Sequence, residues 1–161
     1  MEQINPEYVA RQKTLLECID LEIAVSLIYR EFSRLFPSES DFWIELALEE
    51  EDHARLYLAA DMLQLTGEYA AVRFPPAAFI TRTLAFTEQI KDHLQKRTFS
   101  LNEALDIALK LEKTVAESIV FELPESSDPV IANLRKIING TEAHVDRIER
   151  FRMEKGFSLP G

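Results

Sequence analysis

The segment Trp43–Ala60, WIELALEEEDHARLYLAA, decides the fold because its apolar residues recur at the spacing of an α-helix. One face of this helix is apolar and is interrupted midway by Glu50 and His53. Residues three apart on a helix are neighbours, with about 5–6 Å between their Cβ atoms. Burying a carboxylate on such a face is costly unless the group is paired or coordinated. We therefore expect Glu50 and His53 to share a ligand, against the alternative of an acidic surface helix with an isolated histidine.

Length and composition favour a single all-α domain spanning residues 1–161. Apolar residues make up 47% of the chain, which is enough for a substantial core. Only four glycines interrupt long runs of helix-forming residues. The net charge of −10 argues against nucleic acid and anionic membrane surfaces as partners, and it favours the binding of cations.

The sequence contains neither a membrane-spanning segment nor a pair of cysteines, and both observations bear on the expected cellular location. No apolar run approaches the roughly 20 residues that cross a bilayer, and the N-terminal residues MEQINPEYVARQK lack the apolar core of a signal peptide. We therefore expect a cytoplasmic protein that does not contact membranes. The single cysteine, Cys18, excludes an internal disulfide and any Cys-x-x-Cys module, and we expect it to be a buried, inert thiol.

The chain divides into four long helices and a shorter accessory helix. The short connection around Pro37 makes the first two helices antiparallel neighbours. The accessory helix lies in the long connection 68–98, and the third helix opens with a capping box that begins at Ser100. The expected helices cover residues 6–36, 40–65, 78–96, 100–124 and 128–155.

The two halves of the chain repeat one pattern. In the first half, Glu22 lies on the inward face of its helix, 28 residues before Glu50 and 31 residues before His53. In the second half, Glu112 lies 32 residues before His144. Each half is thus a helix with one inward glutamate, followed by a helix with an inward histidine.

Two antiparallel helix pairs joined by one long crossover form the ferritin-like type of four-helix bundle. In that architecture two metal ions are held by one glutamate from each of two helices and by Glu-x-x-His from each of the other two. The repeat therefore predicts a ferritin-like antiparallel four-helix bundle, with the accessory helix in the crossover and a metal site between the helices.

The helices also resemble a known family. LEIAVSLIYREFSRL (21–35), FWIELALEEEDHARL (42–56), ALKLEKTVAESI (108–119) and INGTEAHVDRI (138–148) are similar to the rubrerythrin-like branch of the ferritin-like superfamily. Members of that branch are di-iron carboxylate proteins that reduce peroxide or oxidise ferrous iron. The resemblance implies that Tyr29 sits beside the metal ions. It implies five metal ligands: Glu22, Glu50, His53, Glu112 and His144.

The chain departs from this family in three places. Thr141 replaces the glutamate of the second Glu-x-x-His, while Glu142 is displaced by about 100° around the helix. Val115 replaces an additional glutamate of rubrerythrin itself. The four-cysteine rubredoxin domain is missing from this sequence, so a peroxidase would need an external electron donor, such as a rubredoxin-type protein. The hydroxyl of Thr141 is expected beside the metal ions, where it can hydrogen-bond a bridging water.

Imidazole and carboxylate ligands suit iron, with manganese or zinc as alternatives, at one or two ions per chain. Two functions stay open: a di-iron oxidoreductase of the peroxidase or ferroxidase type, and a non-catalytic metal-binding or iron-handling protein. A homodimer joined through residues 78–96 is expected for the latter. A third alternative is a helical bundle that has lost its metal. We expect His93 and three acidic residues, Glu49, Glu51 and Asp52, to face solvent.

Overall fold

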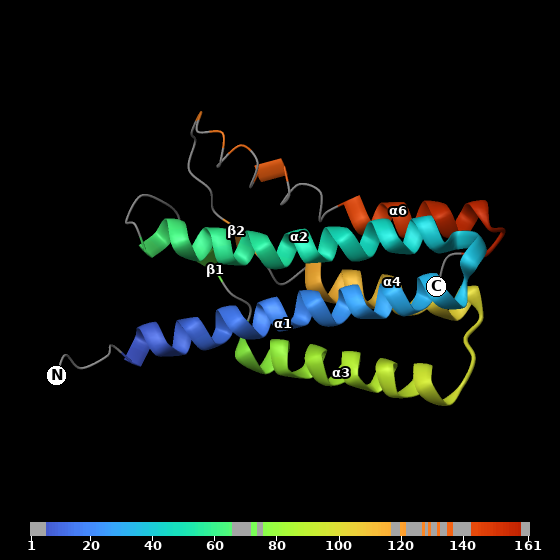
Figure 1. The fold of residues 1–161 in the computed structure, drawn as a ribbon, viewed down its shortest axis with the longest axis horizontal. Coiled ribbons are helices and arrows are strands. Elements are labelled where there is room, and N and C mark those ends of the chain that lie inside the picture. Colours follow the sequence, from blue (N-terminus) through green and yellow to red (C-terminus); the bar gives the residue numbers. More distant parts are fainter. Residues whose placement is uncertain are drawn as a thin grey trace.

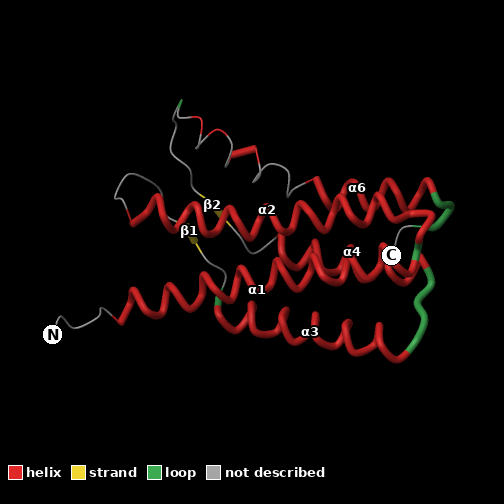
Figure 2. Tube along the Cα trace, viewed as in Figure 1, coloured by secondary structure: helices red, strands yellow, loops and turns green. Residues whose placement is uncertain are grey.

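The structure is a computed structural model that describes residues 6–65, 72–73, 76–116, 120–121 and 143–158, and the isolated residues 127, 129, 132, 135 and 136. The described part is all-helical apart from two short paired strands, which confirms the predicted all-α class. Its long helices run roughly along the long axis of the molecule (Figures 1 and 2). They are α1 (Pro6–Leu35), α2 (Ser40–Leu65), α3 (Ala77–Lys96), α4 (Leu101–Ala116) and α6 (Ala143–Glu154).

Helices α1 and α2 form the most extensive helix pair among the described residues. A short 3-10 helix, η1 (Pro37–Glu39), reverses the chain between them because proline fixes the backbone where α1 has ended. The two helices then run side by side in opposite directions (Figure 1). The expectation of antiparallel neighbours is confirmed.

Helix α3 packs on α1, and Figure 1 shows it on the side of α1 away from α2. Its inward face carries Ile80, Thr83, Thr87 and Ile90, all buried. His93 lies on its polar side and is exposed, as expected. The apolar face of α3 is therefore covered by α1 of the same chain.

The second half differs from expectation in two places. The helix predicted to reach Pro124 ends earlier, since Val120 and Phe121 form strand β2, which pairs antiparallel with β1 (Val72–Arg73). Strand β1 lies in the long connection 68–98, where only the accessory helix was expected. Outside the helices, the backbone N–H and C=O groups of these two segments can pair with each other across the two strands. Of the helix predicted over 128–155, α6 is described, whereas Thr141 lies outside the described residues.

The N-terminus of α4 confirms the predicted capping box. The backbone N–H of Glu103 donates to Ser100 Oγ at 3.2 Å, and the backbone N–H of Ser100 donates to Glu103 Oε2 at 2.9 Å. Two backbone donors that the helix leaves open are thus satisfied reciprocally. This fixes the start of the helix that carries Glu112.

The hydrophobic core runs between α1, α2, α4 and α6 and draws Ile90 from α3. Trp43, Phe32 and Ile148 are fully buried in it, and Phe42 stacks on Phe151 with ring centroids 3.8 Å apart. The core therefore ties α6 to α2 on one side of the polar cluster described below. Within the described helices, none is both long enough and apolar enough to cross a membrane.

Candidate metal centre

The residues predicted as metal ligands come together inside the protein, from four different helices. α1 carries the first, α2 the next two, and α4 and α6 one each, and every one of these residues is at most 5% exposed. These residues are Glu22, Glu50, His53, Glu112 and His144. Ionisable side chains are rarely buried without partners, so the cluster must be held by its internal contacts or by a bound cation.

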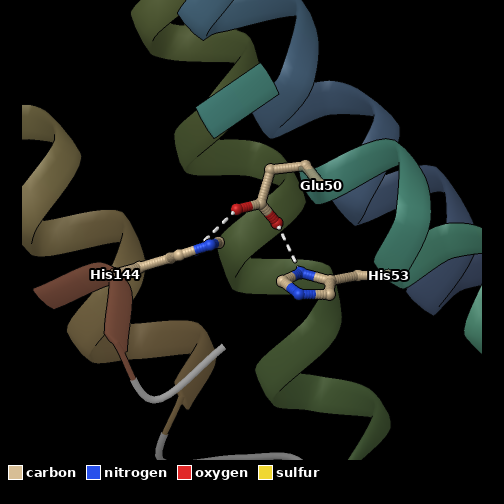
Figure 3. A group of neighbouring side chains, drawn as sticks. All are labelled: Glu50, His53 and His144. Atoms are coloured by element: carbon tan, nitrogen blue, oxygen red, sulfur yellow. Dashed lines mark hydrogen bonds and ion pairs between the residues drawn. The ribbon is translucent and has the colours of Figure 1, made fainter. Parts of the chain in front are cut away.

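Glu50 is the central group of the cluster (Figure 3). Its Oε2 lies 3.1 Å from Nδ1 of His53, one turn further along α2. Its Oε1 lies 3.1 Å from Nδ1 of His144, which comes from α6. The Glu50 carboxylate therefore lies close to Nδ1 of both histidines, one from each half of the chain.

The three groups are spaced almost as ligands of one ion. Each of Glu50, His53 and His144 offers one atom, and these atoms lie within 4.8 Å of one another. Ligand atoms about 2.0–2.2 Å from a shared ion are at most about 4.4 Å apart. Small side-chain movements would thus bring them to bonding distance. The two imidazole rings already lie close, with centroids 5.3 Å apart.

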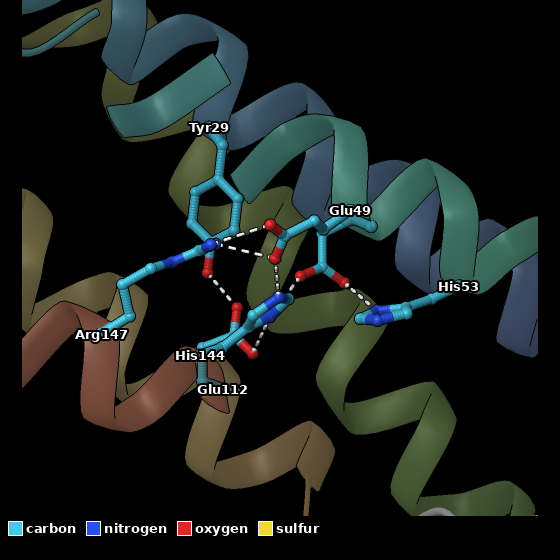
Figure 4. A network of polar contacts seen from close by, with 7 residues as sticks. Tyr29, Glu49, His53, Glu112, His144 and Arg147 are labelled. Carbon is cyan, nitrogen blue, oxygen red and sulfur yellow. Dashed lines mark hydrogen bonds and ion pairs between the residues drawn. The ribbon is translucent and has the colours of Figure 1, made fainter. Parts of the chain in front are cut away.

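His144 is surrounded by carboxylates on both edges of its ring (Figure 4). Its Nε2 hydrogen-bonds Glu49 Oε2, and its Nδ1 lies 3.2 Å from Glu112 Oε2. Burial alone would lower the pKa of His144, but the carboxylates of Glu112, Glu49 and Glu50 around its ring outweigh it and raise the pKa to about 12. Without metal, both ring nitrogens therefore carry a proton, and a cation bound at Nδ1 would replace one of them.

The single N–H at Nδ1 of His144 cannot serve both of its carboxylate neighbours. Its direction suits Glu112, and Glu50 Oε1 is left without a hydrogen-bond donor although it lies 3.1 Å away. A second buried oxygen, Glu22 Oε2, also lacks a hydrogen-bond partner. Buried carboxylate oxygens without donors are costly, and a divalent cation is the partner that carboxylate oxygens and Nδ1 atoms can share. The donor set therefore fits a metal ion.

The pKa values of Glu22 and Glu50 are both raised. Burial raises the pKa of Glu22 first, and the charge of Glu50 raises it further. Burial also raises the pKa of Glu50, and the charge of Glu112 adds to this effect. Burial lowers the pKa of His53, which keeps its imidazole neutral, the form that binds metals.

Tyr29, expected beside the metal ions, lies at the edge of the cluster. Its hydroxyl donates to Glu112 Oε1 at 2.5 Å, and its ring is fully buried against Trp43. Burial and the nearby charge of Glu112 raise the pKa of Tyr29 well above its usual value. The phenol therefore keeps its proton and orients the carboxylate that faces His144.

Glu49 and Arg147 belong to the cluster, although the sequence did not single them out. Glu49, expected on a solvated face, is 38% exposed, and its carboxylate also turns to His144 and accepts two hydrogen bonds of 2.8 Å from Arg147. Arg147 follows His144 by three residues, so the two lie on the same face of α6. That spacing was the available signal. Of the other two acids, Asp52 is exposed as expected, whereas Glu51 is only partly exposed and forms an ion pair with Arg30.

Cys18, one turn before Glu22, is buried as expected. Burial raises the pKa of its thiol to about 12, and the charge of Glu22 adds to this effect. The thiolate, which is the reactive form, is therefore scarce at neutral pH. Cys18 belongs to a smaller core cluster with Leu15, Tyr57 and Ile80 and fits the role of an inert core residue.

Comparison of the chain with protein-family models, with curated proteins and with solved structures found no match. Functional inference therefore depends on the residues of this cluster.

Proposed function

We propose that this protein binds iron or another divalent metal in the buried Glu/His cluster, at one or two ions per chain. The observation that carries the proposal is the position of Glu50 between Nδ1 of His53 and Nδ1 of His144. Glu22 and Glu112 flank this triad and offer carboxylates for a second ion. Iron is favoured by the carboxylate-rich donor set, and manganese and zinc share the same ligand preferences.

The ferritin-like architecture is part of this proposal. The buried ligands come from α1, α2, α4 and α6, which correspond to the four ligand-bearing helices of that fold, and α3 lies in the long connection between the halves. The rubrerythrin-like resemblance of the helices supports the same assignment.

A purely structural role for the cluster is disfavoured by its charge. Three carboxylates converge in the interior, and burial raises the pKa of two of them, Glu22 and Glu50. A core built for stability alone would be served better by apolar side chains of similar volume. Binding of a cation would offset the repulsion and stabilise the folded protein through linkage.

Metal analysis tests this proposal. After reconstitution with ferrous iron under anaerobic conditions and removal of excess metal, we expect one to two ions per chain and a higher melting temperature. His93→Ala, an exposed histidine on α3, is the matched control and should bind as much metal as the wild type. Absence of metal uptake, together with an unchanged melting temperature, would contradict metal binding.

A second candidate function is the reduction of peroxide or O₂, favoured by Tyr29. Two bound ferrous ions would supply the two electrons that reduce peroxide to water. The hydroxyl of Tyr29 donates a buried hydrogen bond to Glu112, beside His144, and so places a polar O–H group at the edge of the site. An external donor, such as a rubredoxin-type protein, would return the electrons. The alternative is metal storage or handling without turnover.

Rapid mixing separates these two functions. An oxidoreductase that carries ferrous iron should be oxidised by one equivalent of hydrogen peroxide within seconds and should turn over repeatedly with an added reductant. A metal-handling protein should keep its ferrous iron on that timescale or should release it. Zinc-loaded protein is the control, because zinc has no redox chemistry.

A further inference from the structure

Glu49 and Arg147 form a contact at the edge of the cluster that the proposed ligand set does not include. Arg147 donates from Nη1 to Glu49 Oε1 and from Nη2 to Glu49 Oε2, each at 2.8 Å. This parallel, two-fold arrangement is the most specific geometry for an arginine–carboxylate pair. Both side chains are about one-third exposed, at 31% and 38%, whereas His144 is buried.

The two nitrogens of His144 face different groups. Nδ1 lies at 3.1 and 3.2 Å from Glu50 and Glu112, whereas Nε2 meets Glu49 on the outer side (Figure 4). Nδ1 and Nε2 lie on different edges of the imidazole ring, so a cation bound at Nδ1 cannot also reach the Glu49 carboxylate that holds Nε2. Glu49 is therefore not a ligand of that cation. Instead, Glu49 holds the imidazole ring at Nε2, on the edge that faces away from Glu50 and Glu112.

Resting on the proposed metal site, we propose that Glu49, clamped by Arg147, is a positioning residue for His144. Its carboxylate keeps the proton on Nε2, so that the lone pair of Nδ1 is turned toward Glu50 and Glu112 when metal binds. A carboxylate on the outer ring nitrogen also makes the imidazole a stronger donor to metal. The clamp joins α2 to α6, so it holds the histidine of the second half in the site of the first.

The geometry also explains how the second half can form a site without a glutamate at position 141. The carboxylates at His144 come from α2 and α4, and Glu49 holds the ring in the orientation that those carboxylates need. Since Glu49 adjoins Glu50 in sequence, one turn of α2 supplies both the shared ligand and the positioning carboxylate.

The test measures Co²⁺ affinity by its visible absorption, in competition with a chelator. Glu49→Ala should weaken binding by about 10–100-fold, the usual effect of losing the partner of a ligand histidine. Glu49→Gln should recover part of that loss, because its amide oxygen still accepts from Nε2–H. The control Glu51→Ala removes a neighbouring ion pair on the same helix, to Arg30, and should leave the affinity unchanged.

A double-mutant cycle tests the clamp. Arg147→Ala should weaken Co²⁺ binding in the wild type and should have no further effect in Glu49→Ala, because Arg147 acts on the metal only through Glu49. In the zinc-loaded protein, the Nε2–H proton of His144 should be visible by NMR and slow to exchange. It should exchange rapidly in Glu49→Ala, a signature that loss of stability alone would not give.

The outcomes are distinct. Co²⁺ binding by the wild type that is equally tight in Glu49→Ala and Glu51→Ala would overturn the role of Glu49 and leave the metal site intact. Equal weakening by Glu49→Ala and Glu51→Ala, or additive effects of Glu49 and Arg147, would likewise overturn it. Absence of Co²⁺ binding by the wild type would overturn the metal site, and the positioning role with it.

Discussion

In the first half of the chain His53 receives its carboxylate from its own helix, at 3.1 Å from Glu50. In the second half His144 meets Glu49 and Glu50 from α2 and Glu112 from α4. The first half thus builds its contact locally, whereas the second borrows carboxylates across the molecule. A buried histidine can thus be surrounded by carboxylates that come entirely from the helices packed around it.

The strongest test of this comparison is removal of the shared carboxylate. Glu50→Ala should weaken metal binding at both histidines by at least about 100-fold, or about 2.7 kcal/mol. His144→Ala should cost less, because Glu22, Glu50 and His53 still form one half-site. The measurement is a ferrous or Co²⁺ titration of each variant, with Asp52→Ala, an exposed acid on the same helix, as control. Equal losses in Glu50→Ala and His144→Ala would show that the halves do not differ.

Tyr29→Phe tests the contacts of the second half, because Tyr29 holds the carboxylate of Glu112. The variant removes the hydroxyl that donates to Glu112 and leaves a buried carboxylate oxygen without that donor. We expect the free energy of unfolding of the metal-free protein to fall by about 1.5–3 kcal/mol, the usual worth of a hydrogen bond to a charged group. Urea unfolding measures this, and Tyr8→Phe, at an exposed tyrosine, should change nothing. An unchanged midpoint in Tyr29→Phe would mean that Glu112 is held by His144 alone.

Thr141→Glu restores the glutamate of the repeat and so should reduce the difference between the halves. The sequence spacing predicts about tenfold tighter binding of a second metal ion, equal to about 1.4 kcal/mol. Added bulk and charge should cost the metal-free protein about 1–3 kcal/mol, and metal should recover this stability. Metal titrations and melts with and without ferrous iron measure both effects. A variant that is destabilised in both states and binds no more metal would place Thr141 away from the site.

The smallest expected effect concerns the start of α4. Ser100→Ala should lower the free energy of unfolding by about 1 kcal/mol, because the capping hydroxyl is lost. Ser38→Ala is the control, since Ser38 is an exposed serine within η1 and does not cap a helix there. Equal effects of the two substitutions would indicate that the cap does not stabilise the second half.

The capping box also predicts a dependence on pH. Hydrogen bonds from the Ser100 backbone, Arg97 and the Ser100 side chain lower the pKa of Glu103 from 4.5 to about 2. The stabilisation from this carboxylate is therefore full above about pH 4.5 and is lost as the pH falls through about 2. Urea midpoints of wild type and Ser100→Ala should converge over that range. Parallel curves would contradict the assignment.

Most helix boundaries and the burial of the five predicted ligands could be predicted from the sequence alone. Helical spacing located α1, α2 and α3 to within a residue or two, and the capping box located the start of α4. The spacing of Glu22, Glu50, His53, Glu112 and His144 predicted that they would be buried together, and all five are. These features are local, because the 3.6-residue period and the capping contacts act over one or two turns of the chain.

Which carboxylates contact which histidine depends on the tertiary packing of the helices. Glu49 has acidic neighbours in the sequence, a pattern typical of a solvated face, yet the position of α6 beside α2 brings Arg147 and His144 to it. The early end of α4 and the pairing of β1 with β2 likewise depend on segments about 48 residues apart. Such contacts depend on how the elements pack against one another. The residue pattern of a single helix does not reveal which side chains of another helix will contact it.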